Sequence, residues 1–132
     1  VVGDGPLLKQ LKDKAEKENI SDVYFTGARK DVEKIIPSAD VLVLPSFSES
    51  FGLVLIEALA SGKPVIGSDV GGIKEIITPE VGLLIDPNSP ETIADAVDKI
   101  ILDDEFRTNL ASNARNRAKI FSKVEIPYDE VK

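Results

Sequence analysis

Cysteine and histidine are both absent from this 132-residue sequence. Without cysteine the chain has no disulfide bonds and no thiol chemistry, and it carries no information about a redox compartment. A zinc site of the usual kind is not expected without either residue. Any catalytic triad that uses histidine is excluded within the chain. The sequence also has no apolar run long enough to cross a membrane and no visible secretory signal.

Positive charge is also scarce, since 16 Lys and Arg stand against 23 Asp and Glu, a net charge of −7. This balance argues against a nucleic-acid partner, although backbone amides can still hold a small phosphate ligand. The composition, 42% hydrophobic and 30% charged, is typical of a soluble globular domain. We expect one domain over residues 1–121 and a tail over 122–132. Val1-Val2-Gly3 reads like the end of a strand, which predicts a fragment or a protein whose beginning was removed.

Short apolar runs alternate with helical patterns along the whole chain. The run Val41 to Leu44 is apolar without alternation, which is typical of a strand covered on both faces. The pattern therefore predicts an α/β fold, a Rossmann-like, doubly wound parallel sheet with helices on both faces. The expected strands are 23–25, 41–44, 64–67 and 81–85, and the expected helices are 7–18, 31–36, 53–60, 73–77, 90–101 and 104–120. Asn19 and Gly62 are expected to end the first and third of these helices. In the stretch Asp86 to Glu91, an N-cap before Pro90 is expected to start the fifth.

The most informative stretch runs from Glu49 to Glu57, after the central strand and into the next helix. In a parallel sheet, ligands bind beyond the carboxyl ends of the strands. The amides of Phe51, Gly52 and Leu53 fall in the first helical turn, where they favour an anion, and Gly52 leaves room for a ligand to approach. The apolar neighbours of Glu57 in the sequence indicate that its carboxylate is partly buried. Two interpretations of the acids stay open. They are ordinary residues near a helix start, or they accept hydrogen bonds from ligand hydroxyls.

Other polar or glycine-rich positions favour structural interpretations. Gly3-Asp4-Gly5 is read as a turn rather than a phosphate loop, and Gly71-Gly72 as a turn rather than an anion nest. Asp69 and Asp86 lie on different loops, so caps are favoured over metal ligands. The basic run of Arg115, Arg117 and Lys119 in the last helix indicates a solvated face or a cation complement to the C-terminus of that helix, and membrane contact is the weaker interpretation.

Several motifs in order resemble one family. They are Val2 to Pro6, Phe25-Thr26-Gly27, Ala39-Asp40-Val41, Pro45-Ser46, the Glu-x7-Glu stretch Glu49 to Glu57, Ala58 to Pro64, and Gly71-Gly72. Together they resemble the C-terminal, donor-binding domain of family-4 (group 1) retaining glycosyltransferases, which have the GT-B fold. The resemblance spans about residues 1–120.

The resemblance implies a role for each matching position. Glu49 would be the catalytic residue that faces the donor sugar, and Glu57 would hold the ribose hydroxyls. The amides of Phe51, Gly52 and Leu53, with Ser50 beside them, would hold the sugar and the diphosphate. The loop of Gly27, Ala28 and Arg29 would flank the nucleotide base, largely through backbone.

It also implies what the parent protein does. It would be a hexosyltransferase-type enzyme of polysaccharide or glycolipid biosynthesis that transfers a sugar from a nucleoside-diphosphate sugar to an acceptor hydroxyl, with no metal and no other cofactor. The acceptor, a sugar or a lipid-linked molecule, would bind to an N-terminal domain absent from this sequence. We expect the full-length protein in the cytoplasm or peripherally at the inner face of the membrane. The resemblance further implies that the fragment lacks the first strand and helix of the donor domain, which supply the cationic partners of the diphosphate. This fragment, without the N-terminal domain and those partners, is expected to be inactive.

Two alternatives stay open. A sugar-nucleotide 2-epimerase of the same fold would use a similar donor, but the spacing of Glu49 and Glu57 with Phe51-Gly52-Leu53 favours transfer. A stand-alone, non-catalytic nucleotide-binding module would fit the truncated start.

Overall fold

The computed structural model describes residues 1–121, and the predicted tail over 122–132 lies outside the described residues. The chain divides into two compact units, Val1–Val32 and Glu33–Lys132, each described by itself. The prediction of a single domain over 1–121 stays a prediction.

The first unit contains one regular helix, α1 (Leu8–Lys17). The helix ends at Asn19, as predicted, because Asn19 takes a left-handed conformation with φ 56°. The amide of Ile20 then donates to the carbonyl of Ala15 over 2.8 Å, which satisfies a carbonyl of the last helical turn.

The strand predicted at residues 23–25 is wrong. The extended chain there makes one isolated parallel bridge, between Val2 and Gly27, and no strand. The amide of Thr26 donates to the carbonyl of Val1, and the amide of Gly3 donates to the carbonyl of Gly27, each over 2.9 Å. These bonds make Gly3-Asp4-Gly5 part of a paired turn, as the structural interpretation predicts.

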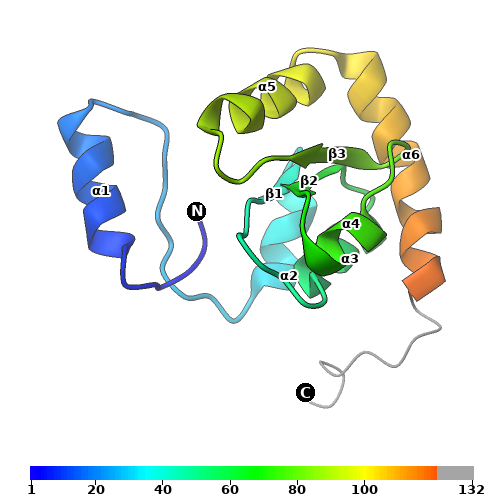
Figure 1. Ribbon diagram of the computed structural model, residues 1–132, viewed down its shortest axis with the longest axis horizontal. Helices are drawn as coiled ribbons and strands as arrows, with labels where there is room; N and C mark the ends of the chain where they lie inside the picture. Colours follow the sequence, from blue (N-terminus) through cyan, green and yellow to red (C-terminus); the bar gives the residue numbers. More distant parts are fainter. Residues whose placement is uncertain (122–132) are drawn as a thin grey trace. The chain divides into compact units, whose positions relative to one another are not determined.

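The second unit is built on a three-stranded parallel sheet in the order β1-β2-β3. The strands are β1 (Leu42–Leu44), β2 (Val65–Ser68) and β3 (Gly82–Ile85). The central strand is β2, which is buried along its whole length, and not the strand predicted at 41–44, which is β1 at one edge of the sheet. This confirms the predicted α/β architecture, since each strand is connected to the next through a helix (Figure 1).

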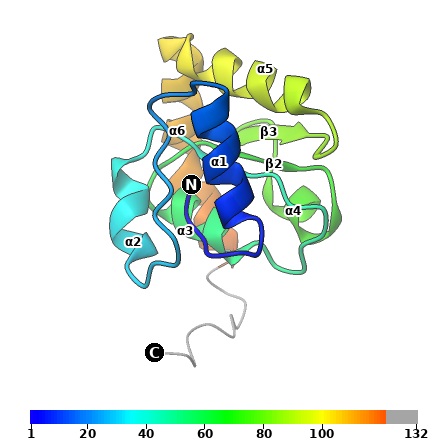
Figure 2. The ribbon, with the colours of Figure 1, turned by 90° about the vertical axis from the view of Figure 1, so that its left-hand side faces the viewer.

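Helices cover both faces of this sheet. In both views α5 (Pro90–Ile101) lies on one side of the strands, whereas α3 (Leu53–Ala60) and α4 (Gly71–Ile76) lie on the other (Figures 1 and 2). The long helix α6 (Asp104–Phe121) contacts helices of both layers, α5 and α3. The chain enters the unit through α2 (Val32–Ile35) and a 3-10 turn (Ile36–Ser38) that contains Pro37.

The core is aliphatic and forms on both sides of β2. On the α5 side, Ile66 packs with Ile85, Ala96, Ile100 and Leu110. On the opposite side, α4 approaches the strand so closely that a Cβ on Gly67 would lie 2.7 Å from Ile73 Cγ2. Successive residues of a strand point to opposite faces, so Ile66 faces the α5 layer and Gly67 faces the α4 layer.

Helix ends follow the predicted capping residues. Ser89 caps α5, with its hydroxyl accepting from the amide of Thr92 over 3.3 Å, and Pro90 follows in the first turn. Gly62, with φ 77°, ends α3, and the amide of Lys63 donates to the carbonyl of Ala58 over 3.0 Å. Ser89 therefore sets the start of α5, and Gly62 sets the end of α3, the helix that carries Glu57.

Candidate functional site

The loop between β1 and α3, residues 45–52, lies at the carboxyl end of β1, where parallel sheets bind ligands. Gly52 caps α3 in a left-handed conformation, with φ 62° and ψ 42°. A Cβ there would lie 3.2 Å from Ile76 Cδ1 and 3.3 Å from Leu55 Cδ1, inside the protein. The reason predicted for this glycine, room for a ligand, is therefore wrong. Glycine is required by the positive φ and by the packing underneath.

The first turn of α3 presents backbone amides that have no protein partner. Within residues 1–121, no carbonyl or side chain accepts a hydrogen bond from the amides of Phe51, Gly52, Leu53 or Val54, and the first helical bond is that of Leu55 to the carbonyl of Gly52, at 2.9 Å. The dipole of the helix adds partial positive charge at this end. The turn can therefore bind an anion such as a phosphate.

Glu57 lies one turn further along α3 and is half-buried. Burial, and in second place the nearby carboxylate of Glu33, raise the pKa of Glu57 above its usual 4.5. No side chain or amide within the described part of the chain donates to this carboxylate. A partly buried carboxylate without a partner is costly, so hydroxyl donors from a ligand would stabilise it.

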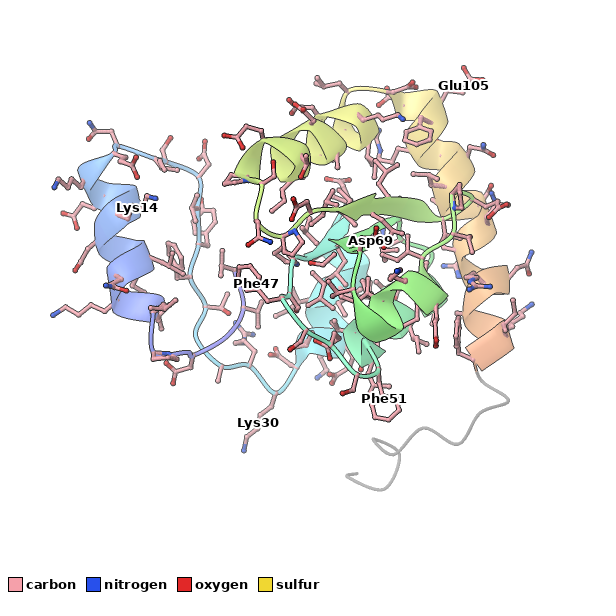
Figure 3. The ribbon with its side chains drawn as sticks, in the orientation of Figure 1. Lys14, Lys30, Phe47, Phe51, Asp69 and Glu105 are labelled. Atoms are coloured by element: carbon pink, nitrogen blue, oxygen red, sulfur yellow. The ribbon has the colours of Figure 1, made fainter. Side chains whose placement is uncertain are left out.

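Glu49 precedes the turn and lines an open groove. The groove has a volume of about 520 Å³ and is lined by Phe47, Ser48, Glu49, Ser50, Val70 and Gly71. The carboxylate of Glu49 accepts one long hydrogen bond, from the hydroxyl of Ser46 at 3.5 Å. Phe47 and Phe51, on either side of Glu49, are 71% and 61% exposed and project from different parts of the loop (Figure 3). The carboxylate therefore has unused acceptor capacity beside the groove.

The turn that enters α4, residues 69–72, packs its backbone against this loop. The amide of Gly72 donates to the carbonyl of Glu49 over 3.1 Å. A Cβ on Gly72 would lie 2.2 Å from the carbonyl oxygen of Ser50, and one on Gly71 would lie 2.6 Å from that of Glu49. The amide of Gly72 is therefore occupied, and the glycine pair is explained by this close approach rather than by a plain turn.

The other predicted site residues lie in the first unit. Gly27 has φ 71°, and its carbonyl accepts from the amide of Gly3 and from the hydroxyl of Thr26, each at 2.9 Å. The guanidinium of Arg29 binds both oxygens of Asp31, at 2.8 and 2.7 Å, and this hydrogen bonding lowers the pKa of Asp31. No hydrogen bond within residues 1–121 uses Ala28. The arginine side chain is thus engaged, which leaves the backbone of Ala28 available to a ligand.

Sequence reasoning missed Ser68, at the carboxyl end of β2. This residue is fully buried, and its hydroxyl has no hydrogen-bond partner within the described residues. A serine ending an apolar strand beside a glycine-rich loop is the signal that could have singled it out. A hydroxyl in this state can bind an ordered water at the edge of the sheet.

Two negative results concern the described residues only. Residues 1–121 include no cluster of three or more acidic side chains that could share a metal ion. Asp69 instead pairs with Lys74 over 3.8 Å, and Asp86 accepts from the amide of Asn88 over 2.9 Å. No helix in this part of the chain has the length and apolar character of a membrane span.

The chain is similar to proteins of one family. The family model described as "Glycosyl transferases group 1" matches residues 1–117. N-acetyl-alpha-D-glucosaminyl L-malate synthase of Bacillus anthracis is 35% identical over 140 residues, covering 99% of this chain and 37% of that protein. Sucrose-phosphate synthase from Thermosynechococcus elongatus has a TM-score of 0.82 at 30% identity, covering 98% of this chain and 36% of that one. HepE of Anabaena, in complex with UDP-glucose, has a TM-score of 0.81 at 28% identity, and the match covers 90% of this chain and 35% of that one.

The fold and the matched family model define the class of protein: an open parallel α/β domain of a sugar-transferring enzyme. The chain belongs to the group 1 glycosyltransferases, and the predicted resemblance to their C-terminal, donor-binding domain is confirmed. It spans about a third of the length of the curated relatives that it matches.

Proposed function

We propose that the protein containing this chain transfers a glycosyl unit from a nucleoside-diphosphate sugar to an acceptor hydroxyl, with retention of the anomeric configuration. In this proposal the chain supplies most of the donor site. Glu49 and Ser50 contact the sugar, the first turn of α3 holds the diphosphate, and Glu57 holds the ribose. The loop of Gly27, Ala28 and Arg29 flanks the base.

One observation carries the proposal, the chemistry of the first two turns of α3. Unpartnered amides at Phe51 to Val54 are followed, one turn later, by the unpartnered carboxylate of Glu57. A nucleoside diphosphate offers a matching order of groups, an anion next to a pair of vicinal hydroxyls. The anion accepts from the amides, and the hydroxyls donate to the carboxylate.

The groove beside Glu49 supports a role for this residue in transfer. Its carboxylate has free acceptor capacity, and Ser48 and Ser50 line the same groove. A carboxylate in this position can orient sugar hydroxyls and stabilise positive charge that develops at the reacting carbon. The departing phosphate oxygen takes the proton of the acceptor hydroxyl.

Complexes of similar proteins support a nucleotide sugar as the ligand. HepE of Anabaena has been crystallised with UDP, with UDP-glucose and with UDP and glucose. A mannosyltransferase of Mycobacterium tuberculosis that is 38% identical to this chain is named as dependent on GDP-mannose. The relatives therefore use different bases, and the test includes more than one.

The proposal is tested by titration calorimetry of the full-length protein with uridine, guanosine and adenosine diphosphates and the corresponding sugar nucleotides. We expect one base to be preferred, and Glu57→Ala to weaken binding by roughly 1–3 kcal/mol through lost charge-assisted hydrogen bonds. The matched control is Glu105→Ala, which removes an exposed acid of α6. Wild-type affinity in the Glu57 variant would remove the ribose assignment, and no binding to any of the three would reject the donor site.

A further inference from the structure

The backbone of the loop that carries Glu49 rests on α4 at two places. At one end of the loop, Gly72 donates to the carbonyl of Glu49 over 3.1 Å. At the other end, the space beside Gly52 is filled by Ile73 and Ile76, with Ile76 Cδ1 3.2 Å from the Cβ position. The helix therefore supports the loop at Glu49 and again at Gly52, where α3 begins.

The contact at Gly71 and Gly72 admits no side chain. A Cβ at position 72 would lie 2.2 Å from the carbonyl oxygen of Ser50 and 2.9 Å from its carbonyl carbon. A Cβ at position 71 would lie 2.6 Å from the carbonyl oxygen of Glu49, and Gly71 has φ 41°. Because both obstacles are backbone atoms of the loop, any larger residue must displace the loop itself.

Apart from this backbone contact, little holds the carboxylate of Glu49 in place. Its one hydrogen bond within residues 1–121 comes from the hydroxyl of Ser46 over 3.5 Å, which is at the limit of a hydrogen bond. The orientation of the side chain therefore depends on where its own backbone is held. That backbone is held by Gly72.

We infer that Gly71 and Gly72 are positioning residues for the reaction: they hold the backbone of Glu49 and Ser50 and so place the Glu49 carboxylate against the donor sugar. This role rests on the proposed transfer of a glycosyl unit. The amide of Gly72 is already bound to the carbonyl of Glu49, so this glycine acts through the loop. A displacement of about 1 Å at a reacting group can cost about a hundredfold in rate.

The test compares Gly71→Asn with Gly62→Asn in the full-length protein. Asparagine tolerates a positive φ, so the substitution at position 71 mainly introduces the Cβ that meets Glu49. Gly62 also has a positive φ, but its Cβ would meet only the flexible guanidinium of Arg115, at 3.0 Å. The control therefore makes the same substitution without displacing the loop.

We expect Gly71→Asn to lower kcat by about tenfold to a hundredfold, with the Kd for nucleoside diphosphate changed by less than about threefold. Gly62→Asn should leave kcat within about threefold of wild type. An unchanged kcat in a folded Gly71→Asn protein overturns the positioning role, as does an equal loss in kcat and in diphosphate affinity. If the wild-type protein binds no nucleotide sugar, the proposed function itself is rejected. Failure of the positioning role and failure of the proposed function therefore give different results.

A measurement on the wild-type protein covers the case in which Gly71→Asn does not fold. Hydrogen exchange of the Gly72 amide reports the bond to Glu49 directly. If this bond couples the loop to α4, the sugar nucleotide should slow exchange at Gly72 by at least about threefold more than the nucleoside diphosphate alone does. Equal exchange with the two ligands overturns the inference.

Discussion

Nε of Arg117 in α6 donates to the carbonyl oxygen of Ile76, the last residue of α4, over 2.9 Å. Nη2 of the same arginine donates to the carbonyl of Glu75 over 2.5 Å. The carbonyls of the last helical turn have no partners within their own helix, and they carry partial negative charge. The arginine satisfies both requirements and ties α4, which supports the Glu49 loop, to α6.

We expect Arg117→Ala to lower the free energy of unfolding by roughly 1.5–3 kcal/mol, because two charge-assisted hydrogen bonds are lost. Arg115→Ala is the comparison, since its bond to the carbonyl of Ser61 is longer, at 3.5 Å, and should be worth less. Urea unfolding of both variants measures the difference. Equal losses in the two variants would show that the carbonyl contacts do not account for the effect.

Gly52→Ala should destabilise the protein for two reasons. The positive φ of 62° costs a residue with a Cβ roughly 1–2 kcal/mol. The new Cβ also lies only 3.2 Å from Ile76 and 3.3 Å from Leu55.

Gly5→Ala is the matched control, because Gly5 has no positive φ and nothing lies within 4 Å of its Cβ position. It should be neutral or slightly stabilising. Thermal unfolding distinguishes the two, and a Gly52→Ala variant as stable as wild type would contradict the left-handed cap.

The features that the sequence predicted are those set by residues close together in the chain. Periodic apolar residues predicted the helices, and Asn19, Gly62 and Ser89 correctly marked their ends. The strand predicted at 23–25 failed because pairing depends on a neighbour. Within the first unit only the segment at Val2 is available, and it makes a single bridge.

The contacts that hold the site together join residues far apart in the sequence. The bond from Arg117 to Ile76 spans 41 residues, and the approach of Gly72 to Ser50 joins two loops. No local pattern distinguishes an arginine that binds a distant carbonyl from one on a solvated face, so the contact of Arg117 with α4 was not predicted. Glu57 was different, since its apolar neighbours in the sequence already indicated partial burial.

Glu57→Gln should make the ligand-free protein more stable at neutral pH. The pKa of Glu57 is raised in the folded state by burial and by Glu33, so the folded protein releases this proton less readily than the unfolded chain does. As the pH rises from the usual value of 4.5 through the raised pKa, ionisation therefore reduces the stability of the wild-type fold. Glutamine does not ionise and avoids this loss.

The difference in unfolding free energy between Glu57→Gln and wild type should vanish below about pH 4, where both residues are neutral. Urea unfolding without ligand measures this difference in unfolding free energy from about pH 3.5, below the usual carboxyl pKa, to about pH 7, above it. Glu33→Gln removes one cause of the raised pKa and should narrow the gap. A gap that is constant over the whole pH range would mean that ionisation of Glu57 is not responsible.

Glu49→Gln should act on turnover rather than on nucleotide affinity. The carboxylate lines the groove and not the first turn of α3, so the diphosphate and ribose contacts are retained. We expect kcat to fall by about a hundredfold or more, in the range measured for the loss of one charge-stabilising group. The Kd for nucleoside diphosphate should stay within about threefold of wild type. Steady-state kinetics and calorimetry on one preparation measure kcat and the Kd together. An equal loss in kcat and in diphosphate affinity would contradict this prediction.

The exposed position of Phe47 makes the groove accessible to fluorescence. The sequence contains no tryptophan, and Phe47 is 71% exposed on the groove lining next to Glu49. Phe47→Trp would therefore place the only indole of these 132 residues in the groove lining next to Glu49, and its emission would report on groove occupancy. A change in this emission with a sugar nucleotide, but not with the nucleoside diphosphate, would distinguish binding of the sugar in the groove from binding of the diphosphate.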